Sequence, residues 1–166
     1  MLTCHHQAIT VSCPHMPTLA HNKKALSEYR VQEEIEAGIV LTGPEVKSAK
    51  AGSLNLRGSY VSIDQKPEAW LVNATISKYA PAAAVQIGYD PLHRRRLLLS
   101  KKEMMYLLGK QHERGLTIIP ISVYTKGGLI KVKVAIAAGK KQFDKRQDIK
   151  KREVNRSIRY NLKIKH

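Results

Sequence analysis

The chain has 166 residues and a hydrophobic fraction of 43%, which fits one domain with tails and a largely aliphatic core. Its net charge of +16 favours an anionic partner, because so large a surplus repels itself, and the candidates are RNA, DNA and an anionic membrane. A membrane partner requires an apolar anchor, and the sequence shows neither a transmembrane stretch nor a secretory signal, so we expect a soluble cytoplasmic protein that does not bind membranes.

Residues 1–21 are expected to form a disordered leader, because polar residues and prolines leave no compact apolar run in them. A zinc site is the alternative reading, since zinc prefers thiolate and imidazole ligands. The spacing of the available ligands matches no zinc finger or ribbon, so we expect no metal there. Those ligands are Cys4, His5, His6, Cys13 and His15.

The first predicted strand spans residues 29–41, although acidic residues interrupt its β-compatible pattern. A short helix is predicted to follow, because Thr42 is a suitable N-cap and Glu45 completes a capping box with it. Pro44 suits the first helical turn, and Gly52 is expected to end the helix.

Two further strands are predicted at residues 59–63 and 69–77, with residues 64–68 as the hairpin loop between them. In the first of these strands hydrophobic residues alternate with polar ones, as a half-buried strand requires. Residues 79–92 contain two prolines and are predicted to form a loop.

A second helix is predicted after residue 100, because Ser100 and Glu103 form another capping box and apolar residues then line one face. Gly115 is expected to end it. An arginine triplet, residues 94–96, precedes this helix together with three leucines. We expect the triplet on a loop, where its guanidinium groups are available to phosphates.

The last pair of strands is the clearest hairpin in the sequence. Residues 116–125 and 129–137 are strongly β-prone, and the turn between them, residues 126–128, contains two glycines. Hydrophobic and polar residues alternate in the second strand, so one face enters the core and Lys131 and Lys133 point outward.

The order strand, short helix, strand pair, helix, strand pair predicts a mainly β fold with short helices. Antiparallel strands with helices at the corners favour an OB-type antiparallel β-barrel over residues 22–138. A flexible basic C-terminal tail, residues 139–166, is expected to follow it. With eleven basic and three acidic residues, the tail should stay disordered until it binds a polyanion.

The tail supports two interpretations equally well from its residues alone. Asp144 and Gln147 resemble a capping pair, and Phe143 and Tyr160 carry rings that suit stacking on bases. These features favour a specific bound structure. A non-specific basic tail, which serves solubility and loose attraction to RNA, explains the same composition.

The sequence offers no active site, so we do not expect an enzyme. It contains no nucleophile elbow, no glycine-rich phosphate loop and no helical zinc-protease motif. Glu33, Glu34 and Glu36 cluster along one strand, where alternation places Glu33 on the face opposite to the other two. Such a run is best explained as surface charge, and we expect no catalytic residue, cofactor or metal.

RNA is the partner that the basic features favour when they are taken together. Lys131 and Lys133 offer phosphate contacts on a rigid strand, and the tail offers many more. Either cluster alone would be read as solvated charge. A rigid face and a flexible tail imply two contact surfaces, so the protein would bridge two RNAs or bind one RNA on a larger particle.

An ordered series of short strings extends this reading, because together they resemble the small protein B family, the SsrA-binding proteins. The similarity covers about residues 22–152 without large gaps, and the series is far more specific than any one string. The strings are NKKA at 22–25, EAGIVLTG at 36–43, EVKS at 45–48, DP at 90–91, RLLL at 96–99, GK at 109–110, GLT at 115–117, GKK at 139–141 and DKR at 144–146.

The resemblance implies an OB-type barrel that binds the tRNA-like domain of transfer-messenger RNA. Members of that family deliver this RNA to stalled ribosomes, with elongation factor Tu and GTP, for trans-translation. The tail then occupies the empty messenger channel near the decoding region of the small subunit, and the incomplete product is tagged for proteolysis.

The resemblance also assigns residues to these two contacts. The RNA-contacting positions fall on Glu36, Leu98 and Lys131, with Asn55 and Tyr60 nearby, and Lys133 joins them as an outward-facing cation. An acidic residue at an RNA face is expected to accept hydrogen bonds from base amino groups or 2′-hydroxyls. The tail positions expected at the ribosome are Gly139, Lys140, Lys141, Phe143, Asp144, Lys145 and Arg146.

Two other classes of protein compete with this interpretation. A ribosomal protein or general RNA chaperone would share the charge and the barrel but would not need the particular residues of the tail. A catalytic RNA-processing enzyme would need an acid, a base or a metal site, which the sequence does not show.

Overall fold

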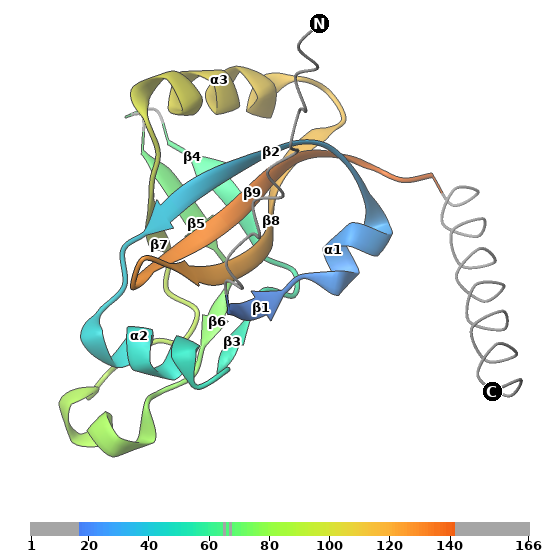
Figure 1. Cartoon of the computed structure of the whole chain (residues 1–166). Coiled ribbons are helices and arrows are strands. Elements are labelled where there is room, and N and C mark those ends of the chain that lie inside the picture. The colour runs from blue at the N-terminus through green and yellow to red at the C-terminus, as the bar shows by residue number, and fades with distance from the viewer. Residues whose placement is uncertain (1–16, 65, 67, 142–166) are drawn as a thin grey trace, which may run out of the picture.

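The protein is described by a computed structural model that covers residues 17–64, 66 and 68–141. Figure 1 shows one curved sheet with helices at its two ends and along one edge. In chain order the elements are β1 (Thr18–His21), α1 (Lys23–Glu28), β2 (Tyr29–Ile39), α2 (Gly43–Lys50), β3 (Leu54–Asn55), β4 (Tyr60–Ile63), β5 (Ala69–Val72), β6 (Thr75–Ile76), the 3-10 segment η1 (Ala80–Val85), β7 (Arg95–Leu98), α3 (Lys101–His112), β8 (Leu116–Lys126) and β9 (Leu129–Gly139).

Seven strands form one antiparallel sheet in the order β1-β8-β9-β2-β7-β5-β4, and β3 pairs with β6 in a second, two-stranded sheet. The large sheet curls, so that β4 at one end also lies against β8. Among the described residues no hydrogen-bonded ladder joins those two strands. The prediction of a mainly β fold with short helices is confirmed, and its OB-like sheet is curled without being a closed barrel.

The core lies on the concave side of the large sheet. Its fully buried residues are aliphatic, with Leu71, Leu97 and Val132 among the least exposed. In β9 every second side chain enters this core, and Lys131 and Lys133 lie on the outer face. Burying each such Leu or Val contributes about 1.5–3 kcal/mol. The alternation predicted for the last hairpin is therefore confirmed.

Both predicted capping boxes are present. The Glu45 carboxylate accepts hydrogen bonds from the backbone N–H of Thr42 at 2.9 Å and from its hydroxyl at 3.0 Å. The carboxylate of Glu103 accepts from the backbone N–H and the hydroxyl of Ser100 at 2.9 and 2.6 Å. Each contact satisfies donors at a helix start that would otherwise lack a partner.

A bulge in β2 between Val31 and Glu33 decides which side chains reach the outer face. Before it, Val31 packs outside the sheet in a small second cluster with Ala25 of α1. After it, Glu34 and Glu36 take the outer face beside β9. Glu33 lies on the other side and accepts a hydrogen bond from the hydroxyl of Tyr106 on α3 at 2.6 Å. The expected division of the three carboxylates is thus confirmed.

The expected leader of residues 1–21 is too long at its C-terminal end. Residues 18–21 form β1, which pairs with β8. His21 adds a side-chain hydrogen bond, with Nδ1 3.0 Å from the carbonyl oxygen of Ile121. This pairing depends on β8, about a hundred residues later, and so leaves no local signal. Residues 1–16 lie outside the described part of the chain.

The single strand predicted at residues 69–77 is wrong, because the chain breaks there into two. Asn73 has a φ of +59°, a left-handed conformation that ends β5. Its side-chain amide donates to the carbonyl of Gly58 at 3.0 Å and holds the turn. The chain then enters the other sheet as β6.

The arginine triplet lies on a loop only at Arg94, which precedes β7. Arg95 and Arg96 belong to β7, an unpredicted strand between β2 and β5. Arg96 and Arg94 point outward, where Arg96 forms an ion pair with Glu68 at 3.2 Å and Arg94 lies over the ring of Trp70. Arg95 points inward and is only 2% exposed, so it is not available to phosphates.

Arg95 is neutralised inside the fold by Glu45, which is 1% exposed, with Nε 2.7 Å from Oε1. Burial alone would raise the pKa of Glu45, but hydrogen bonds from Thr42 and from Arg95 outweigh it, so that the pKa lies below its ordinary value. All N–H groups of the guanidinium find acceptors. These are the Glu45 carboxylate, the carbonyls of Ala74, Pro91 and His93, and the Tyr89 hydroxyl.

We expect Arg95→Met to lower the free energy of unfolding by about 3–5 kcal/mol, because it leaves a buried carboxylate without its partner. The native Glu45 has a lowered pKa, so its contribution is present above the ordinary glutamate pKa and is lost as the pH falls through the lowered one. In the variant the pKa of Glu45 should instead rise, because the carboxylate stays buried without its partner. The loss in free energy of unfolding relative to the wild type should therefore shrink between pH 7 and about pH 5, where this carboxyl takes up a proton.

Urea unfolding at both pH values measures this effect, with the exposed neighbour in Arg94→Met as the control. The control should cost about 1 kcal/mol or less, the usual range for an exposed cation–π contact. Equal losses in the two variants would contradict the central role of the buried pair.

Candidate nucleic-acid interface

A row of three residues crosses the outer face of the large sheet. Gly38 of β2 pairs with Leu98 of β7 on one side and with Lys131 of β9 on the other. Two residues earlier in β2, Glu36 pairs with Lys133. The sheet therefore brings together four of the predicted RNA-binding residues, from three strands that lie far apart in sequence.

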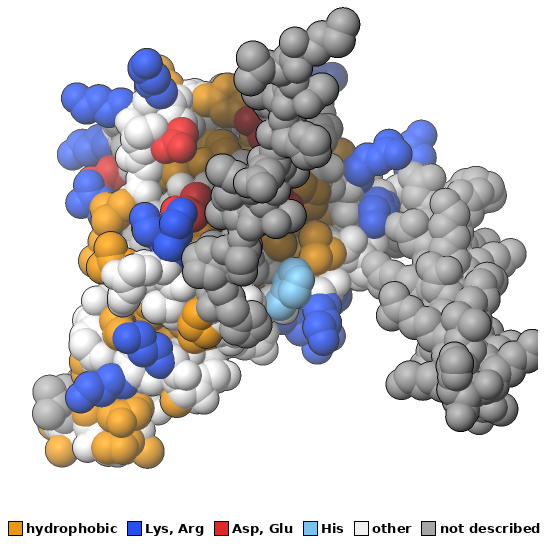
Figure 2. Space-filling view, in the orientation of Figure 1, with side chains coloured by type: hydrophobic (Ala, Val, Ile, Leu, Met, Phe, Trp, Pro, Cys, Tyr) orange, Lys and Arg blue, Asp and Glu red, His pale blue; other side chains and the backbone are white. Residues whose placement is uncertain are grey.

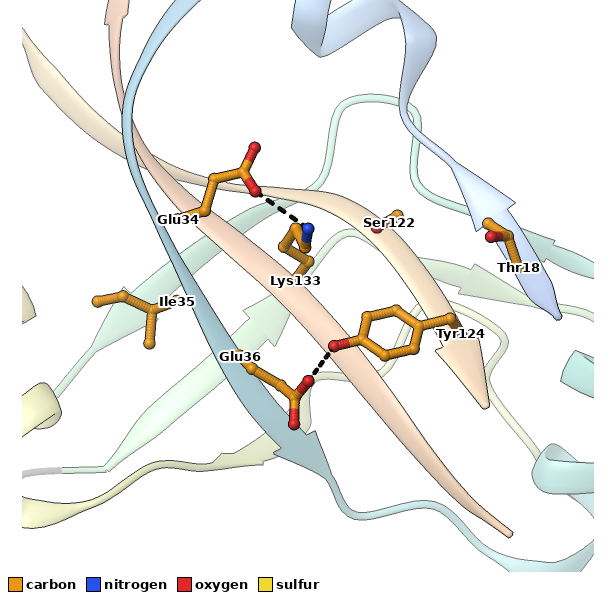
Figure 3. Close-up of a pocket in the computed structure, with 7 residues that line it drawn as sticks. All are labelled: Thr18, Glu34, Ile35, Glu36, Ser122, Tyr124 and Lys133. Atoms are coloured by element: carbon orange, nitrogen blue, oxygen red, sulfur yellow. Dashed lines mark hydrogen bonds and ion pairs between the residues drawn. The ribbon is translucent and has the colours of Figure 1, made fainter. Parts of the chain in front are cut away.

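Glu36 is the centre of a hydrogen-bond network on this face. Figure 3 shows the ring of Tyr124, from β8, extending across β9 so that its hydroxyl donates to the Glu36 carboxylate. The ammonium group of Lys126 lies 3.1 and 3.2 Å from the two carboxylate oxygens, and that of Lys131 lies 3.9 Å away. The carboxylate is thus held in one orientation by groups on two other strands.

The network shifts the pKa values of its two acidic groups in opposite directions. The hydrogen bond from Tyr124 and then that from Lys126 lower the pKa of Glu36. Burial, together with the hydrogen bond to Glu36, raises the pKa of Tyr124 to about 12. At neutral pH the pair is therefore a carboxylate and a protonated hydroxyl that donates to it.

The lysines of this face are already paired with carboxylates. Lys133 contacts Glu34 at 3.1 Å, while Lys126 and Lys131 share Glu36. Three ammonium groups against two carboxylates leave a surplus of one positive charge, too little for strong phosphate attraction. The Glu36 side chain is 35% exposed and keeps unused lone pairs, so the face suits hydrogen-bond donors of an RNA, such as 2′-hydroxyls and base amino groups.

Two shallow grooves flank the row. One, of about 440 Å³, contains the Glu36 network and is shown in Figure 3. The other, of about 330 Å³, is more apolar and contains Leu98 and Leu129, which are 54% and 65% exposed. A Cβ on Gly38 would come within 3.2 Å of the Cβ of Leu98, so the glycine allows Leu98 to lie close to β2. An apolar shelf beside a polar network suits the sugar and base surfaces of an RNA.

Similarity to known proteins identifies the family of this chain. A family model described as "SmpB protein" matches residues 19–164. The chain belongs to the SmpB family. The match spans the curled sheet, the row across it and the tail.

Individual SmpB relatives agree with the family model. An "SsrA-binding protein" of Sulfurihydrogenibium sp. is 48% identical, with 89% of this chain and 95% of the relative covered. One of Thermosipho melanesiensis is 49% identical, with 89% of this chain and 99% of the relative covered. A solved chain titled "tmRNA-SmpB: a journey to the center of the bacterial ribosome" is 37% identical with a TM-score of 0.60, covering 74% of this chain and 85% of that chain.

Two residues that the SmpB resemblance placed near this face line neither of its grooves. Asn55 is an exposed residue of the small β3–β6 sheet, and its side chain accepts from the backbone N–H of Arg57 at 2.9 Å. Tyr60 lies on β4, 46% exposed, in a separate groove of about 220 Å³ with Asn22 and Tyr29. An RNA contact at either residue stays a prediction.

The predicted tail residues divide between the end of β9 and the part outside the described residues. Gly139 closes the ladder opposite Tyr29. Lys140 is tied to α1, since its N–H donates to the carbonyl of Glu28 at 2.9 Å and its ammonium group to that of Leu26 at 3.1 Å. Lys141 is exposed. The structure does not describe Phe143, Asp144, Lys145 and Arg146.

Sequence reasoning missed three contributors to the interface, Tyr124, Lys126 and Leu129. All three could have been found from the hairpin turn. Since Lys126 pairs with Leu129 across the turn, Tyr124 must lie opposite Lys131 and on the same face. The sequence signal for these three residues is therefore the two-glycine turn, which sets the register between β8 and β9.

Two further observations concern only residues 17–64, 66 and 68–141. In that part of the chain no three His, Cys, Asp or Glu side chains lie close enough to hold a metal ion. No helix in it is both long and apolar enough to cross a bilayer.

We expect Tyr124→Phe to raise the pKa of Glu36 toward the ordinary glutamate value, because the hydroxyl that most strongly favours the carboxylate is lost. Carbon-detected NMR titration of the glutamate carboxyl groups measures the shift. Ser122→Ala is the matched control, since Ser122 lines the same groove without a hydrogen bond to Glu36. An unchanged titration of Glu36 in Tyr124→Phe would refute the network.

Proposed function

We propose that the protein binds the tRNA-like domain of transfer-messenger RNA and delivers it to stalled ribosomes for trans-translation. Relatives that are about half identical over nearly the whole chain are named for binding SsrA, which is transfer-messenger RNA. A related solved chain carries a title that joins tmRNA and SmpB with the bacterial ribosome. These names supply the RNA and the particle.

The observation that carries the proposal is the oriented Glu36 carboxylate between paired lysines and exposed Leu98. A surface that only attracted phosphates would have no use for a carboxylate at its centre. A fixed acceptor can instead distinguish one folded RNA from another by the donors it presents. We assign Glu36, Leu98, Lys131 and Lys133 to this contact.

The second contact in the proposal is the tail on the ribosome. Residues 139–146 begin where β9 ends against α1, so the point of departure is fixed by Gly139 and Lys140. From there the basic segment enters the empty messenger channel near the decoding region, while elongation factor Tu and GTP accompany the RNA. The protein acts by binding rather than by catalysis.

Glu36→Ala should weaken binding to transfer-messenger RNA by about 10- to 100-fold, the range expected for hydrogen bonds to a charged group. The direction of the change in affinity distinguishes two kinds of binding. If the face only attracted phosphates, removal of a negative charge would free Lys126 and Lys131 and strengthen binding. Binding is measured against excess ordinary tRNA at two salt concentrations.

Glu34→Ala is the matched control, since it removes the same charge from the same strand without disturbing Tyr124. It should retain the preference for transfer-messenger RNA. A wild-type protein that binds both RNAs equally, with affinity that collapses as salt rises, would instead be a general RNA-binding protein.

A chain that ends at Phe143 should bind transfer-messenger RNA normally but fail to support tagging in a translation system with truncated messages. The reason is that the sheet surface stays intact while most of the basic tail is lost. Gel-shift binding and tag incorporation are measured on the same preparation. A severe loss of RNA binding would rule out two separate contact surfaces.

A further inference from the structure

The cations of the described surface fall into two kinds. Those beside Glu36 are paired with carboxylates, whereas Lys47, Lys50 and Lys78 at the α2 end of the molecule are exposed and form no ion pair with any described carboxylate. We propose that these three lysines, the α2 cation surface, form a second RNA contact that holds the sugar–phosphate backbone. The inference rests on the proposed function and names the part of the protein that supplies its phosphate contacts.

The three lysines are held together by backbone contacts rather than by chance. The hydroxyl of Ser48 on α2 donates to the carbonyl of Ser77 at 2.6 Å, and the N–H of Ser77 donates to the carbonyl of Ser53 at 3.1 Å. The residue after Ser77 is Lys78, so it is fixed beside the helix. The ammonium group of Lys47 lies 5.8 Å from the ring centre of Tyr79 on the same segment.

None of the described acidic side chains forms an ion pair with these three lysines. Glu45 is buried on the inner side of α2 and is engaged by Arg95. The carboxylate of Asp90 accepts the backbone N–H of Leu92 at 2.9 Å within its own turn. Figure 2 shows basic side chains at this lower end with no acidic side chain beside them, whereas both signs occur together over the sheet above.

The helix itself explains only part of this arrangement. Lys47 and Lys50 occupy the last turn of α2, where cations are favourable because of the helix dipole. That effect does not account for Lys78, which lies outside any helix. It also leaves open what balances the charge of three exposed ammonium groups that form no ion pair with a described carboxylate.

The apolar groove beside the Glu36 network connects the sheet face to α2. The apolar groove that contains Leu98 and Lys131 is lined at its other side by Leu41 and Val46, so it leads from the sheet to α2. Val46 directly precedes Lys47. An RNA that rests on Leu98 therefore meets these lysines if it extends along the groove. Phosphates are its only negative groups, and they match the charge of the surface.

Two surfaces with different chemistry have separable effects on binding. Phosphate contacts release counterions, so each contact adds about 0.7–0.9 to the steepness with which log affinity falls against log salt. They also act on all RNAs alike. The α2 cation surface should therefore set the salt dependence, while the Glu36 network sets the preference for one RNA.

The test is the triple variant Lys47→Gln, Lys50→Gln and Lys78→Gln in the full chain. Binding to the tRNA-like domain of transfer-messenger RNA and to ordinary tRNA is measured at four salt concentrations. We expect the slope of log affinity against log salt to decrease in magnitude by about 2–3, while the preference between the two RNAs is retained. Glutamine preserves helix propensity, and circular dichroism confirms that the variant is folded.

The matched control removes the same charge at the opposite end of the molecule, where α3 lies in Figure 1. Its positions, Lys101, Lys102 and Arg114, are likewise exposed and form no ion pair with any described carboxylate, and each is changed to Gln. This control should leave the slope within about 1 of the wild type. An equal fall in both triple variants, or no fall in the first, would overturn the inference.

Failure of the inference and failure of the proposed function give different results. If the wild type prefers the tRNA-like domain but the first triple variant keeps its slope, the function stands and the α2 cation surface is rejected. If the wild type shows no preference, the proposed function fails. A slope that then falls only in the first variant still supports a phosphate-binding surface on α2.

Discussion

The buried ion pair between Glu45 and Arg95 is the constraint on which the arrangement of the surface depends. It joins α2 to β7 across fifty residues, and its remaining hydrogen bonds hold the chain on both sides of the 3-10 segment. A charge at this depth is tolerated only because every donor and the opposing carboxylate are satisfied together. Once Arg95 points inward, alternation turns Arg96 and Leu98 outward. The outward position of Leu98 thus follows from an electrostatic contact inside the fold.

The outer face shows a second use of paired charge. Bringing Glu34 and Glu36 next to three lysines reduces the net charge of the surface and fixes the directions of its donors and acceptors. Polar groups that are oriented in advance lose less conformational entropy when they bind. The cations on α2 are arranged differently, because nothing acidic opposes them. In the proposal, the sheet face orients the RNA and the α2 cation surface attracts its phosphates.

Local patterns predicted the parts of the fold that local physics determines. Both capping boxes, the last hairpin and the outward direction of Lys131 depend on residues within one turn or one strand. The alternation of hydrophobic and polar residues did not predict β7, because one of the inward-facing residues of that strand is an arginine. Its partner Glu45 was recognised only as a helix cap. Equally, β1 is defined by pairing with a strand a hundred residues away. Of the site, the resemblance supplied Glu36 and Leu98, but Tyr124 required the register of the β8–β9 hairpin.

The opposite pKa shifts of Glu36 and Tyr124 have a consequence for the conditions under which the protein works. One group loses its proton at a lower pH than usual, and the other keeps its proton to about pH 12. Both pKa shifts therefore move the titration of these groups away from neutral pH. The pattern of donors and acceptors at the centre of the face is therefore insensitive to moderate changes of pH on either side of neutrality.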